Sequence, residues 1–559
     1  MAEERAWWKE AVVYQIYPKS FDDSDGDGIG DLQGVIDRLD HVAALGADVI
    51  WLNPVYESPQ EDNGYDISDY RAIHEEYGTM ADWERLLEAV HARDMRLIMD
   101  LAVNHTSTEH DWFQRSRRDE DGYREYYFWR EGEEPPNNWK SGFGGSAWSH
   151  DEEAGMQYLH LFDETQADLD WDTEAVRDDV YEMMNWWLEK GIDGFRMDVV
   201  NLVSKPEGLP DGDPAQDWVG IEHFSDGPRA EEYITEMAER TWDDYDTMVV
   251  GECIDIDTET ASDYVSADGP MDMVFHFEHM LVDMGDRWLS PAEWDLTDLK
   301  AIMSNWQTEL DGWNSLYLTN HDQPRIVSRF GDDGAYRRES GKLLGMLLFT
   351  LSGTPYVFQG QEIGMTNYPW SNLDELDDLQ SIGKVEEAMA AGEIDSFEEV
   401  QDIVRARSRD NARTPMQWDD SEHAGFTDGD PWLAVNPDYE DINVAAAEAD
   451  EDSILHYYRD LVALRDAHDV FVYGDYELLL PDHESVWAYR MTLPEDMRTD
   501  GTEVGEALVA LNFSTSETTV SPADAERTDE LLLANYDDGG AVEGELTLRP
   551  YEARVYALD

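Results

Sequence analysis

The chain has a single cysteine, few basic residues and no long uncharged apolar run among its 559 residues. With Cys253 alone, no internal disulfide can form, which is typical of proteins from reducing compartments. No stretch reaches the roughly 18 uncharged apolar residues of a membrane-spanning helix, and the opening segment MAEERAWWKEAVVY has no signal-peptide pattern. These absences predict a cytoplasmic protein with no membrane partner.

Positive charge is scarce: 39 Lys and Arg residues stand against 127 Asp and Glu residues, which gives a formal net charge of −88. A surface this acidic repels phosphate backbones and anionic lipids, so nucleic acid is not expected as a partner. Because 41% of the residues are hydrophobic and 11% aromatic, the acidity does not predict disorder. We interpret it as an adaptation to concentrated salt, as in halophiles.

Eight short apolar runs that end in polar or charged residues occupy the first two thirds of the chain, with segments of helical periodicity between most of them. They span residues 11–18, 47–54, 95–105, 191–200, 247–253, 271–277, 313–322 and 353–362. This alternation predicts parallel βαβ units and an α/β fold, a (β/α)8 TIM barrel. Active sites of such barrels lie at the carboxyl ends of the strands, so the residues that close the runs are the candidates for chemistry.

Two segments are too long to be ordinary connections of a barrel. Residues 106–171, rich in Trp, Gly, Asn and acids, predict an inserted subdomain after the third strand, and residues 366–452 predict a second insertion over the barrel mouth. From residue 478 the apolar period changes to two, which predicts an antiparallel C-terminal β-domain, a β-sandwich, over 478–559. The barrel is then formed by residues 1–105 and 172–477.

A lone acid carries little information in this chain, because a solvated surface position explains most of them. Acids that end an apolar run beside Arg or His are different. Asp198 closes GFRMD two residues after Arg196, so both side chains share one face of a strand. Glu252 closes MVVGE, and Asp322 follows His321 in YLTNHD. These carboxylates are predicted to meet at the barrel mouth.

Two carboxylates at one barrel mouth suit cleavage of a glycosidic bond, because one protonates the leaving oxygen while the other attacks or stabilises the oxocarbenium-like centre. Arg196 favours an ionised Asp198, the nucleophile, whereas the apolar residues before Glu252 favour a protonated acid. The alternative for the acids is a buried ion pair with arginine. For His105, which closes IMDLAVNH, and for His321 the alternative is a hydrogen-bonded place in the core.

Four motifs resemble, in order and spacing, the signature regions of the α-amylase superfamily, glycoside hydrolase family 13. They are DLAVNH (100–105), GFRMDVV (194–200), GEC (251–253) and TNHD (319–322). Further stretches are similar to the oligo-1,6-glucosidase and α-glucosidase branch: YQIYPKSFDDSDGDGIGDLQG (14–34), NGYDISDY (63–70), QADLDW (166–171) and RDNARTPMQW (409–418). The likeness covers essentially the whole chain, although Ala167 and Asp170 depart from the Pro and Asn usual in the branch.

The resemblance implies a retaining enzyme that needs no cofactor for catalysis. It implies Asp198 as the covalent nucleophile, about 5–5.5 Å from Glu252, the general acid/base, with Asp322 as the carboxylate that stabilises the transition state. The residues implied to hold the sugar are Tyr65, Asp66, His105, Gln166, Arg196, Val199, His321 and Arg413. For Arg413 the alternative is a structural salt bridge, since Arg409 lies one helical turn away.

The segment DSDGDGIGD (23–31) has acids at alternate positions and glycines where a loop must turn, which suits a hard cation with oxygen ligands. The candidate ligands are the side chains of Asp23, Asp25, Asp27 and Asp31 and the carbonyl of Ile29. Gly34 stands where an EF-hand has Glu, so the loop is not an EF-hand. It resembles the structural Ca²⁺ or Mg²⁺ loop of the oligo-1,6-glucosidase branch; an acidic turn without metal is the alternative.

Val199 follows the nucleophile, and in this branch Val there goes with α-1,6-linked substrates while Thr goes with α-1,4. The leading prediction is an exo-acting, oligo-1,6-glucosidase-like enzyme for short oligosaccharides, a monomer or weak homo-oligomer. The alternatives are a maltase-type α-1,4-glucosidase, a trehalose-6-phosphate hydrolase and a sucrose-active transglucosidase, although RIVSRFG (325–331) lacks the isomerase-type Arg-Leu-Asp-Arg loop. A transporter-associated barrel domain is disfavoured, because the sequence shows no anchor, partner cysteine or eroded acids.

Overall fold

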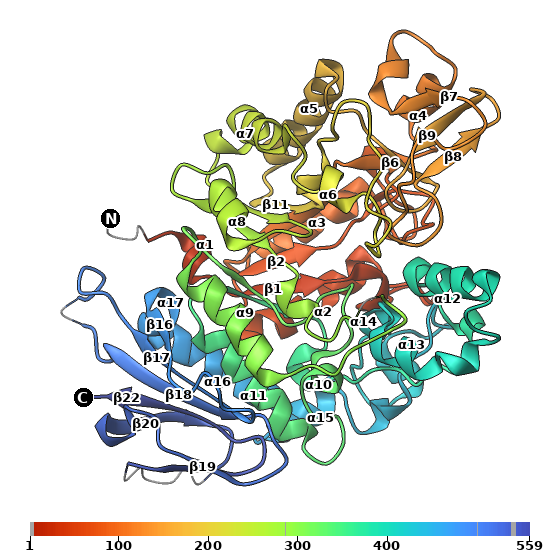
Figure 1. Ribbon diagram of the computed structural model, residues 1–559. Coiled ribbons are helices and arrows are strands. Elements are labelled where there is room, and N and C mark those ends of the chain that lie inside the picture. Colours follow the sequence, from red (N-terminus) through yellow and green to blue (C-terminus); the bar gives the residue numbers. More distant parts are fainter. Residues whose placement is uncertain (1–4, 286, 500, 538–543) are drawn as a thin grey trace.

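A computed structural model of the chain describes residues 5–285, 287–499, 501–537 and 544–559. Eight strands in one parallel sheet curve into a barrel at the centre of the molecule (Figure 1). They are β1 (Val13–Ile16), β2 (Val49–Leu52), β5 (Arg96–Ala102), β11 (Gly194–Asp198), β12 (Met248–Glu252), β13 (Met273–Phe275), β14 (Ser315–Leu316) and β15 (Thr354–Phe358). Each predicted run contains one of these strands, so the predicted TIM-barrel fold is confirmed.

The strand order in the barrel is β13-β12-β11-β5-β2-β1-β15-β14. Side chains join the two end strands: Ser315 Oγ donates to the Val274 carbonyl at 2.6 Å, and the Tyr317 hydroxyl donates to the His276 carbonyl at 2.6 Å. The strands are buried along their length, which explains why they are continuous apolar runs in the sequence.

Helices with one apolar face cover the outside of the barrel. The main ones are α2 (Leu32–Leu45), α3 (Met80–His91), α5 (Glu174–Lys190), α7 (Ala230–Arg240), α8 (Thr258–Val265), α9 (Leu296–Thr308), α11 (Arg337–Thr350) and α16 (Ile454–Ala467). Local sequence fixes their ends. Thr79 and Asp82 form a capping box at the start of α3, and α2 ends at Gly46, whose φ of 93° favours glycine.

The insertion between β5 and α5 contains α4 (Asp111–Arg117) and a small antiparallel sheet of β7 (Trp129–Glu131), β9 (Met156–Leu159) and β8 (Trp148–Asp151). Its ends are joined where β6 (His105–Ser107) pairs with β10 (Gln166–Asp168). A fully buried ion pair, Lys205 Nζ to Asp168 Oδ2 at 2.6 Å, ties this base to the segment after β11. The limits 106–171 of a separate subdomain stay a prediction.

The insertion between β15 and α16 contains α12 (Leu379–Ala391), α13 (Gln401–Arg407), α14 (Asp410–Arg413) and α15 (Val444–Ala449). Helix α12 packs against the first insertion: Lys140 Nζ lies 2.7 Å from Glu387 Oε1, and a Cβ on Gly383 would lie 2.1 Å from the Phe143 carbonyl oxygen. Both insertions therefore lie at the same end of the barrel (Figure 1).

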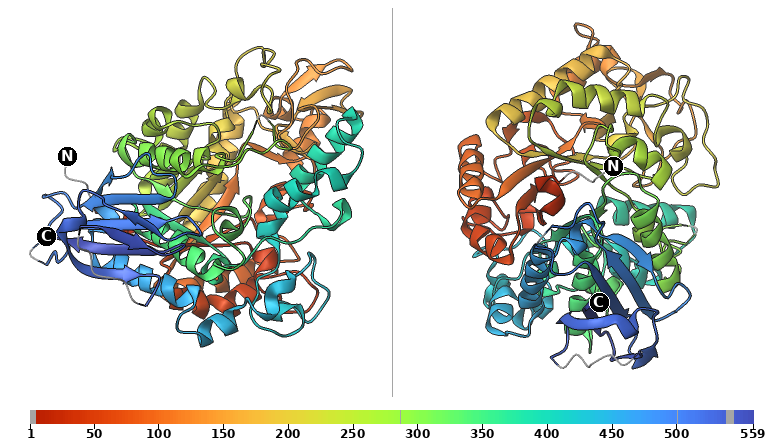
Figure 2. Two further views of the ribbon diagram at one scale, coloured as in Figure 1. Left: turned by 60° about the horizontal axis from the view of Figure 1, so that its bottom comes forward. Right: turned by 90° about the vertical axis from the view of Figure 1, so that its left-hand side faces the viewer.

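The C-terminal part is an antiparallel sheet of order β16-β17-β18-β22-β20, which confirms the predicted C-terminal β-structure. Its strands are β16 (Asp475–Leu478), β17 (Val486–Thr492), β18 (Glu506–Asn512), β22 (Ala553–Leu558) and β20 (Thr528–Ala534). A second pair, β19 (Thr518–Val520) with β21 (Leu546–Leu548), accompanies it. Strand β16 begins before residue 478, and the domain limit stays a prediction. Figure 2 shows this sheet on the side of the barrel away from the insertions.

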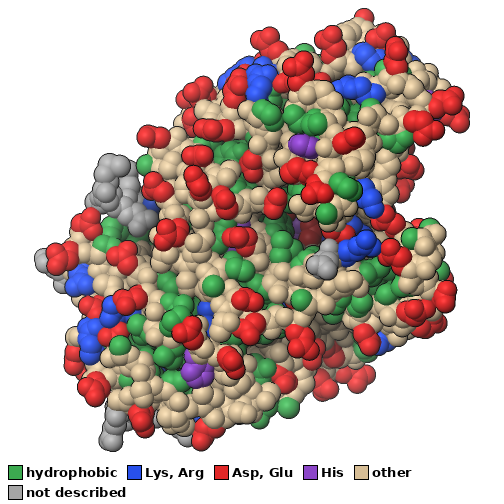
Figure 3. Space-filling model, viewed as in Figure 1, with side chains coloured by type: hydrophobic (Ala, Val, Ile, Leu, Met, Phe, Trp, Pro, Cys, Tyr) green, Lys and Arg blue, Asp and Glu red, His purple; other side chains and the backbone are tan. Residues whose placement is uncertain are grey.

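Acidic side chains are scattered over the whole face drawn in Figure 3, whereas basic ones form only small groups. On this face the negative charge is thus spread out and not collected in one patch, as the sequence predicts. In the described part of the chain, no helix combines the length and apolar character needed to cross a membrane.

Candidate active site

A cavity of about 390 Å³ opens at the carboxyl ends of the barrel strands, within the size range of ligand pockets. Phe143 and Phe162 of the first insertion and Lys384 and Arg407 of the second contribute to its lining. Seven of the predicted site residues line it: Tyr65, His105, Gln166, Asp198, Val199, Glu252 and Asp322. Four predicted residues do not: Asp66, Arg196, His321 and Arg413.

Arg196 holds both predicted catalytic carboxylates. Its Nη1 donates to Asp198 Oδ1 at 2.7 Å and to Asp100 Oδ1 at 2.8 Å, and its Nη2 lies 2.6 Å from Glu252 Oε2. Asp198 and Glu252 end the neighbouring parallel strands β11 and β12, which places them side by side. Arg196 itself is fully buried and does not line the cavity, but it contacts both acids.

The charges around Arg196 do not balance, because three carboxylates surround one guanidinium group. Burial raises the pKa of Asp198 well above its usual range; the carboxylates of Glu252 and Asp100 act in the same direction, and Arg196 opposes them. Arg196 therefore favours an ionised Asp198, as the sequence predicts, but burial and the other two carboxylates outweigh it.

Val199 links the two catalytic strands through its backbone. Its N–H donates to Glu252 Oε2 at 3.1 Å, the oxygen that Arg196 also contacts. The residue has φ 36° and ψ 42°, a left-handed conformation that β-branched residues rarely adopt. A strained backbone conformation persists only where the surrounding structure imposes it. At Val199 this conformation directs the N–H group toward Glu252.

Asp322 lies among three cationic or ionisable groups. Arg413 Nη2 donates to its Oδ1 at 2.8 Å, Arg409 Nη1 lies 3.4 Å from the same oxygen, and His321 Nε2 lies 3.1 Å from Oδ2. Burial opposes ionisation, but these three neighbours lower the pKa of Asp322 well below its usual range. Asp322 therefore favours its ionised form, and both arginines contact it, Arg413 more closely.

A chain of polar side chains extends from β6 and β10 across the cavity. Gln166 Nε2 lies 3.2 Å from His105 Nε2 and donates to Asp62 Oδ2 at 3.1 Å. Burial lowers the pKa of His105 to about 4, so this ring is neutral near pH 7. On the other side, the Tyr65 ring stacks on His321 with centroids 5.3 Å apart. His321 is thus a support for Tyr65 and Asp322.

Asp66 stabilises a loop and does not face the cavity. It is fully buried, and its carboxylate accepts hydrogen bonds from Ser58 Oγ at 2.8 Å and from the N–H groups of Glu61 and Asp62 at 3.0 and 3.2 Å. The cavity is lined instead by Asp62, which the sequence reasoning missed. Burial raises the pKa of Asp62 to about 7.

Arg409, in the sequence only a possible competitor of Arg413, also lines the cavity. Its Nε donates to the fully buried Asp378 at 2.6 Å, and its Nη2 lies 3.4 Å from Asp62 Oδ1. It therefore bridges Asp62 and Asp322. The available signal was its place at the start of RDNARTPMQW, one turn before Arg413.

The family model for the alpha amylase catalytic domain matches residues 15–474. The chain belongs to the alpha-amylase family. This confirms the predicted family, and the protein is a glycoside hydrolase.

Relatives of this alpha-amylase family chain are similar over nearly their full length. An oligo-1,6-glucosidase of Bacillus cereus is 51% identical over 99% of this chain and 100% of its own. A trehalose-6-phosphate hydrolase of Bacillus subtilis (strain 168) is 45% identical over 100% and 99%. Among solved structures, isomaltulose synthase from Klebsiella sp. LX3 has a TM-score of 0.94 at 40% identity and covers both chains fully, at 100%.

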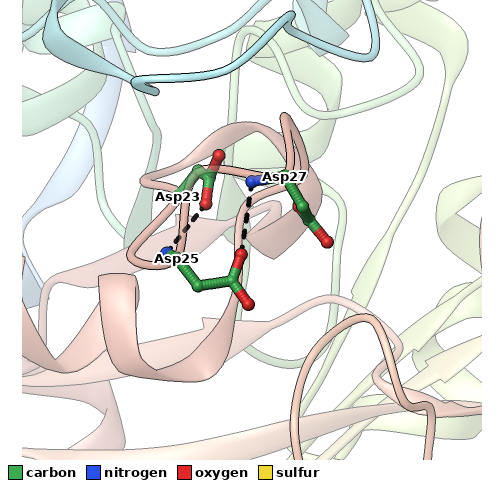
Figure 4. A group of neighbouring side chains, drawn as sticks. All are labelled: Asp23, Asp25 and Asp27. Carbon is green, nitrogen blue, oxygen red and sulfur yellow. Dashed lines mark hydrogen bonds between the residues drawn. The ribbon is translucent and has the colours of Figure 1, made fainter.

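In this alpha-amylase family chain, the acidic loop brings three of the predicted metal ligands together. One carboxylate oxygen each from Asp23, Asp25 and Asp27 lies within 4.8 Å of the others (Figure 4). Asp31 is not in this group: it is the N-cap of α2, where it accepts from Gly34 N at 2.7 Å. Ile29 donates its N–H to Asp27 Oδ1 at 2.9 Å.

Proposed function

We propose that the protein is a retaining, exo-acting α-glucosidase that hydrolyses terminal α-linked glucose from short oligosaccharides, with a preference for α-1,6 linkages. The observation that carries the proposal is the shared contact of Asp198 and Glu252 with Arg196, at 2.7 and 2.6 Å. Such a close pair of carboxylates is what a double-displacement mechanism requires.

In the first step, the Asp198 carboxylate attacks the anomeric carbon while the carboxylic acid of Glu252 protonates the leaving oxygen. In the second step, Glu252 accepts a proton from water, and that water displaces Asp198. This first step needs an ionised Asp198 and a protonated Glu252. Asp322, held anionic by Arg413 and Arg409, stabilises the positive charge that develops on the sugar. No step calls for a cofactor.

The sugar would be held by the polar residues that line the cavity near these acids. His105, Gln166 and Asp62 offer a neutral ring nitrogen, an amide and a carboxylate, and Tyr65 offers a ring face. Three residues that do not line the cavity position the acids: Arg196, His321 and Arg413. Asp66 keeps the loop that carries Asp62 in place.

Two of the cations that line the cavity, Arg329 and Lys384, are paired with acids, which favours a neutral substrate over a phosphorylated one. The relatives include trehalose-6-phosphate hydrolases, and a phosphate dianion requires cations that are free to bind it. Here Arg329 Nη2 lies 2.6 Å from Asp283, and Lys384 lies 3.5 Å from Asp217. Together with the oligo-1,6-glucosidase relatives and Val199 beside the nucleophile, this favours α-1,6-linked oligosaccharides.

The test is glucose release from isomaltose, maltose, sucrose and trehalose-6-phosphate in molar KCl. We expect isomaltose to be the best substrate and the Asp198→Asn variant to be inactive on all four. Faster cleavage of maltose or of the phosphorylated sugar would refute the linkage assignment. Failure on all four substrates with folded protein would refute the hydrolase assignment.

We further propose that the protein works in the cytoplasm at high salt, as a monomer or weak homo-oligomer. The single buried cysteine and the net charge of −88 support this. The oxygens of Asp23, Asp25 and Asp27 fit a hard divalent cation, so we propose that this loop holds Ca²⁺ or Mg²⁺ in a structural role. A rise in thermal midpoint on adding CaCl₂ to chelator-treated protein, absent in Asp25→Ala, is the expected result.

A further inference from the structure

The side chain of Arg409 lies between two acids of the cavity without pairing closely with either. Its Nη2 is 3.4 Å from Asp62 Oδ1, and its Nη1 is 3.4 Å from Asp322 Oδ1. The close contact is made by Nε, which donates to Asp378 Oδ1 at 2.6 Å. The ring of Phe143 packs against the same guanidinium group, with its centroid 4.7 Å from Cζ. Asp378 is therefore the anchor of Arg409.

Asp378 does not line the cavity, and several hydrogen bonds fix its carboxylate. It is fully buried and is the N-cap of α12, where Oδ1 accepts from Gln380 N at 3.0 Å. Its Oδ2 accepts from Arg409 N at 3.1 Å and from two serine hydroxyls. Burial opposes ionisation, but the charges of Arg409 and Arg413 and these hydrogen bonds lower the pKa of Asp378. The anchor is thus a buried carboxylate in a fixed position.

The segments that carry Asp378 and Arg409 are also joined through the backbone. Asp410, which directly follows Arg409, is fully buried, and its Oδ2 accepts from the N–H groups of Asp377 and Asp378 at 2.7 and 3.0 Å. The start of α12 and the start of α14 are therefore held together as one unit. Within this unit the Asp378 carboxylate sets the direction of the Arg409 side chain.

The two cavity acids beside Arg409 depend on it to different extents. Asp322 also contacts Arg413 at 2.8 Å and His321 at 3.1 Å, and these contacts do not involve Arg409. Among the described residues, Arg409 is the one cation that forms an ion pair with Asp62. A displaced Arg409 would therefore affect Asp62 more than Asp322.

We propose that Asp378 is a positioning residue for sugar binding, which fixes Arg409 beside Asp62 and thereby sets the affinity of the cavity for the terminal glucose. The inference rests on the proposed function, in which Asp62 is one of the residues that hold the sugar. An arginine without this anchor would turn to pair with a single acid, because its planar guanidinium group favours two parallel contacts to one carboxylate. It would then no longer lie between Asp62 and Asp322.

The experiment measures kcat and KM for isomaltose in molar KCl with the Asp378→Asn variant. Asn keeps a helix cap and a hydrogen-bond acceptor but removes the charge that anchors Arg409. We expect KM to rise about tenfold, as for the loss of one hydrogen bond to a charged group, while kcat changes less than about twofold. A purely structural role predicts the opposite split: a smaller folded fraction lowers kcat and leaves KM unchanged.

The Arg409→Lys variant tests the same link from the other side and leaves the cap of α12 intact. Lysine has one charged nitrogen and no rigid fork, so it cannot contact Asp378 and Asp62 in a fixed geometry. We expect a similar rise in KM, and Asp378→Asn added to this variant should raise KM by less than about twofold. The matched control is Asp295→Asn at the N-cap of α9. Asp295 accepts from Thr297 N at 2.6 Å and does not line the cavity, so both constants should stay unchanged.

Three results overturn the proposal: an unchanged KM in Asp378→Asn, an unchanged KM in Arg409→Lys, or an undiminished effect of Asp378→Asn in the lysine background. The second result decides against the proposal even if Asp378→Asn does not fold. Failure of the proposed function looks different, because then the parent enzyme releases no glucose from isomaltose.

Discussion

Replacing Lys205 with Met removes a buried charge that joins the first insertion to the barrel. Lys205 Nζ lies 2.6 Å from Asp168 Oδ2 and donates to Asn104 Oδ1 at 2.8 Å, and both charged side chains are fully buried. The Met side chain is nearly as long as that of Lys, so the main effect is that the Asp168 carboxylate loses its charged partner. At an effective dielectric constant of about 20, the lost attraction at this distance is about 6 kcal/mol before desolvation is counted.

Breaking a buried pair from one side costs about 3–5 kcal/mol in measured cases. Asp168 keeps two other hydrogen bonds, from Leu161 N at 2.9 Å and from Asn104 Nδ2 at 3.1 Å. We therefore expect Lys205→Met to lower the free energy of unfolding by about 3 kcal/mol, at the lower end of that range. The measurement is denaturant unfolding in molar KCl, followed by tryptophan fluorescence.

Two further variants make this experiment decisive. Lys190→Met removes a partly exposed pair with Glu84 at 2.7 Å and should cost less than about 1 kcal/mol. Adding Asp168→Asn to Lys205→Met removes the unpaired charge but keeps an acceptor for Leu161, so it should restore at least half of the loss. The reasoning is refuted if Lys205→Met costs no more than Lys190→Met, or if the second substitution restores nothing.

Three other outcomes are expected. Val199→Thr should raise the ratio of kcat/KM for maltose to kcat/KM for isomaltose. An unchanged ratio would show that residue 199 does not determine the linkage preference. Asp62→Ala should lower kcat/KM for isomaltose about 10- to 100-fold with little change in the free energy of unfolding. Asp66→Ala should instead lower the free energy of unfolding by about 1–3 kcal/mol. The reverse pattern would contradict the assignment of Asp62 to the cavity and Asp66 to the loop. Burial raises the pKa of Asp272, which accepts from Val249 N at 2.7 Å, to about 7 from an ordinary value of 3.8. The folded state then binds more protons than the unfolded state between these values, so this group's contribution to stability is present below about pH 4 and lost as the pH rises toward 7. Asp272→Asn should remove this loss and gain stability relative to the parent as the pH rises from 4 to 7; a constant difference across that range would show that Asp272 is not perturbed.

The barrel and the placement of Asp198 and Glu252 could be predicted because both depend on local patterns. A buried parallel strand is a continuous apolar run, and Asp198 and Glu252 end two such runs, so parallel pairing places them at one rim. The raised pKa of Asp198 could not be predicted, because it depends on burial and on Asp100, which comes from a third strand.

Side chains on loops were harder to place, since their direction depends on backbone turns and on distant partners. Asn63 and Gly64 both have positive φ, 51° and 101°, and the reversal they produce sends Asp62 into the cavity and Asp66 into the loop. The motif NGYDISDY predicts the turn but does not show which acid faces the cavity. Similarly, Asp31 caps α2 because the helix begins directly after it.

The central claim is that Asp198 and Glu252 cleave the glycosidic bond by double displacement. The most direct measurement is the anomeric form of the glucose first released from isomaltose, recorded by proton NMR before mutarotation. The account predicts α-glucose, with the β form rising only later. Initial release of β-glucose would contradict it, because water would then attack without a covalent intermediate on Asp198.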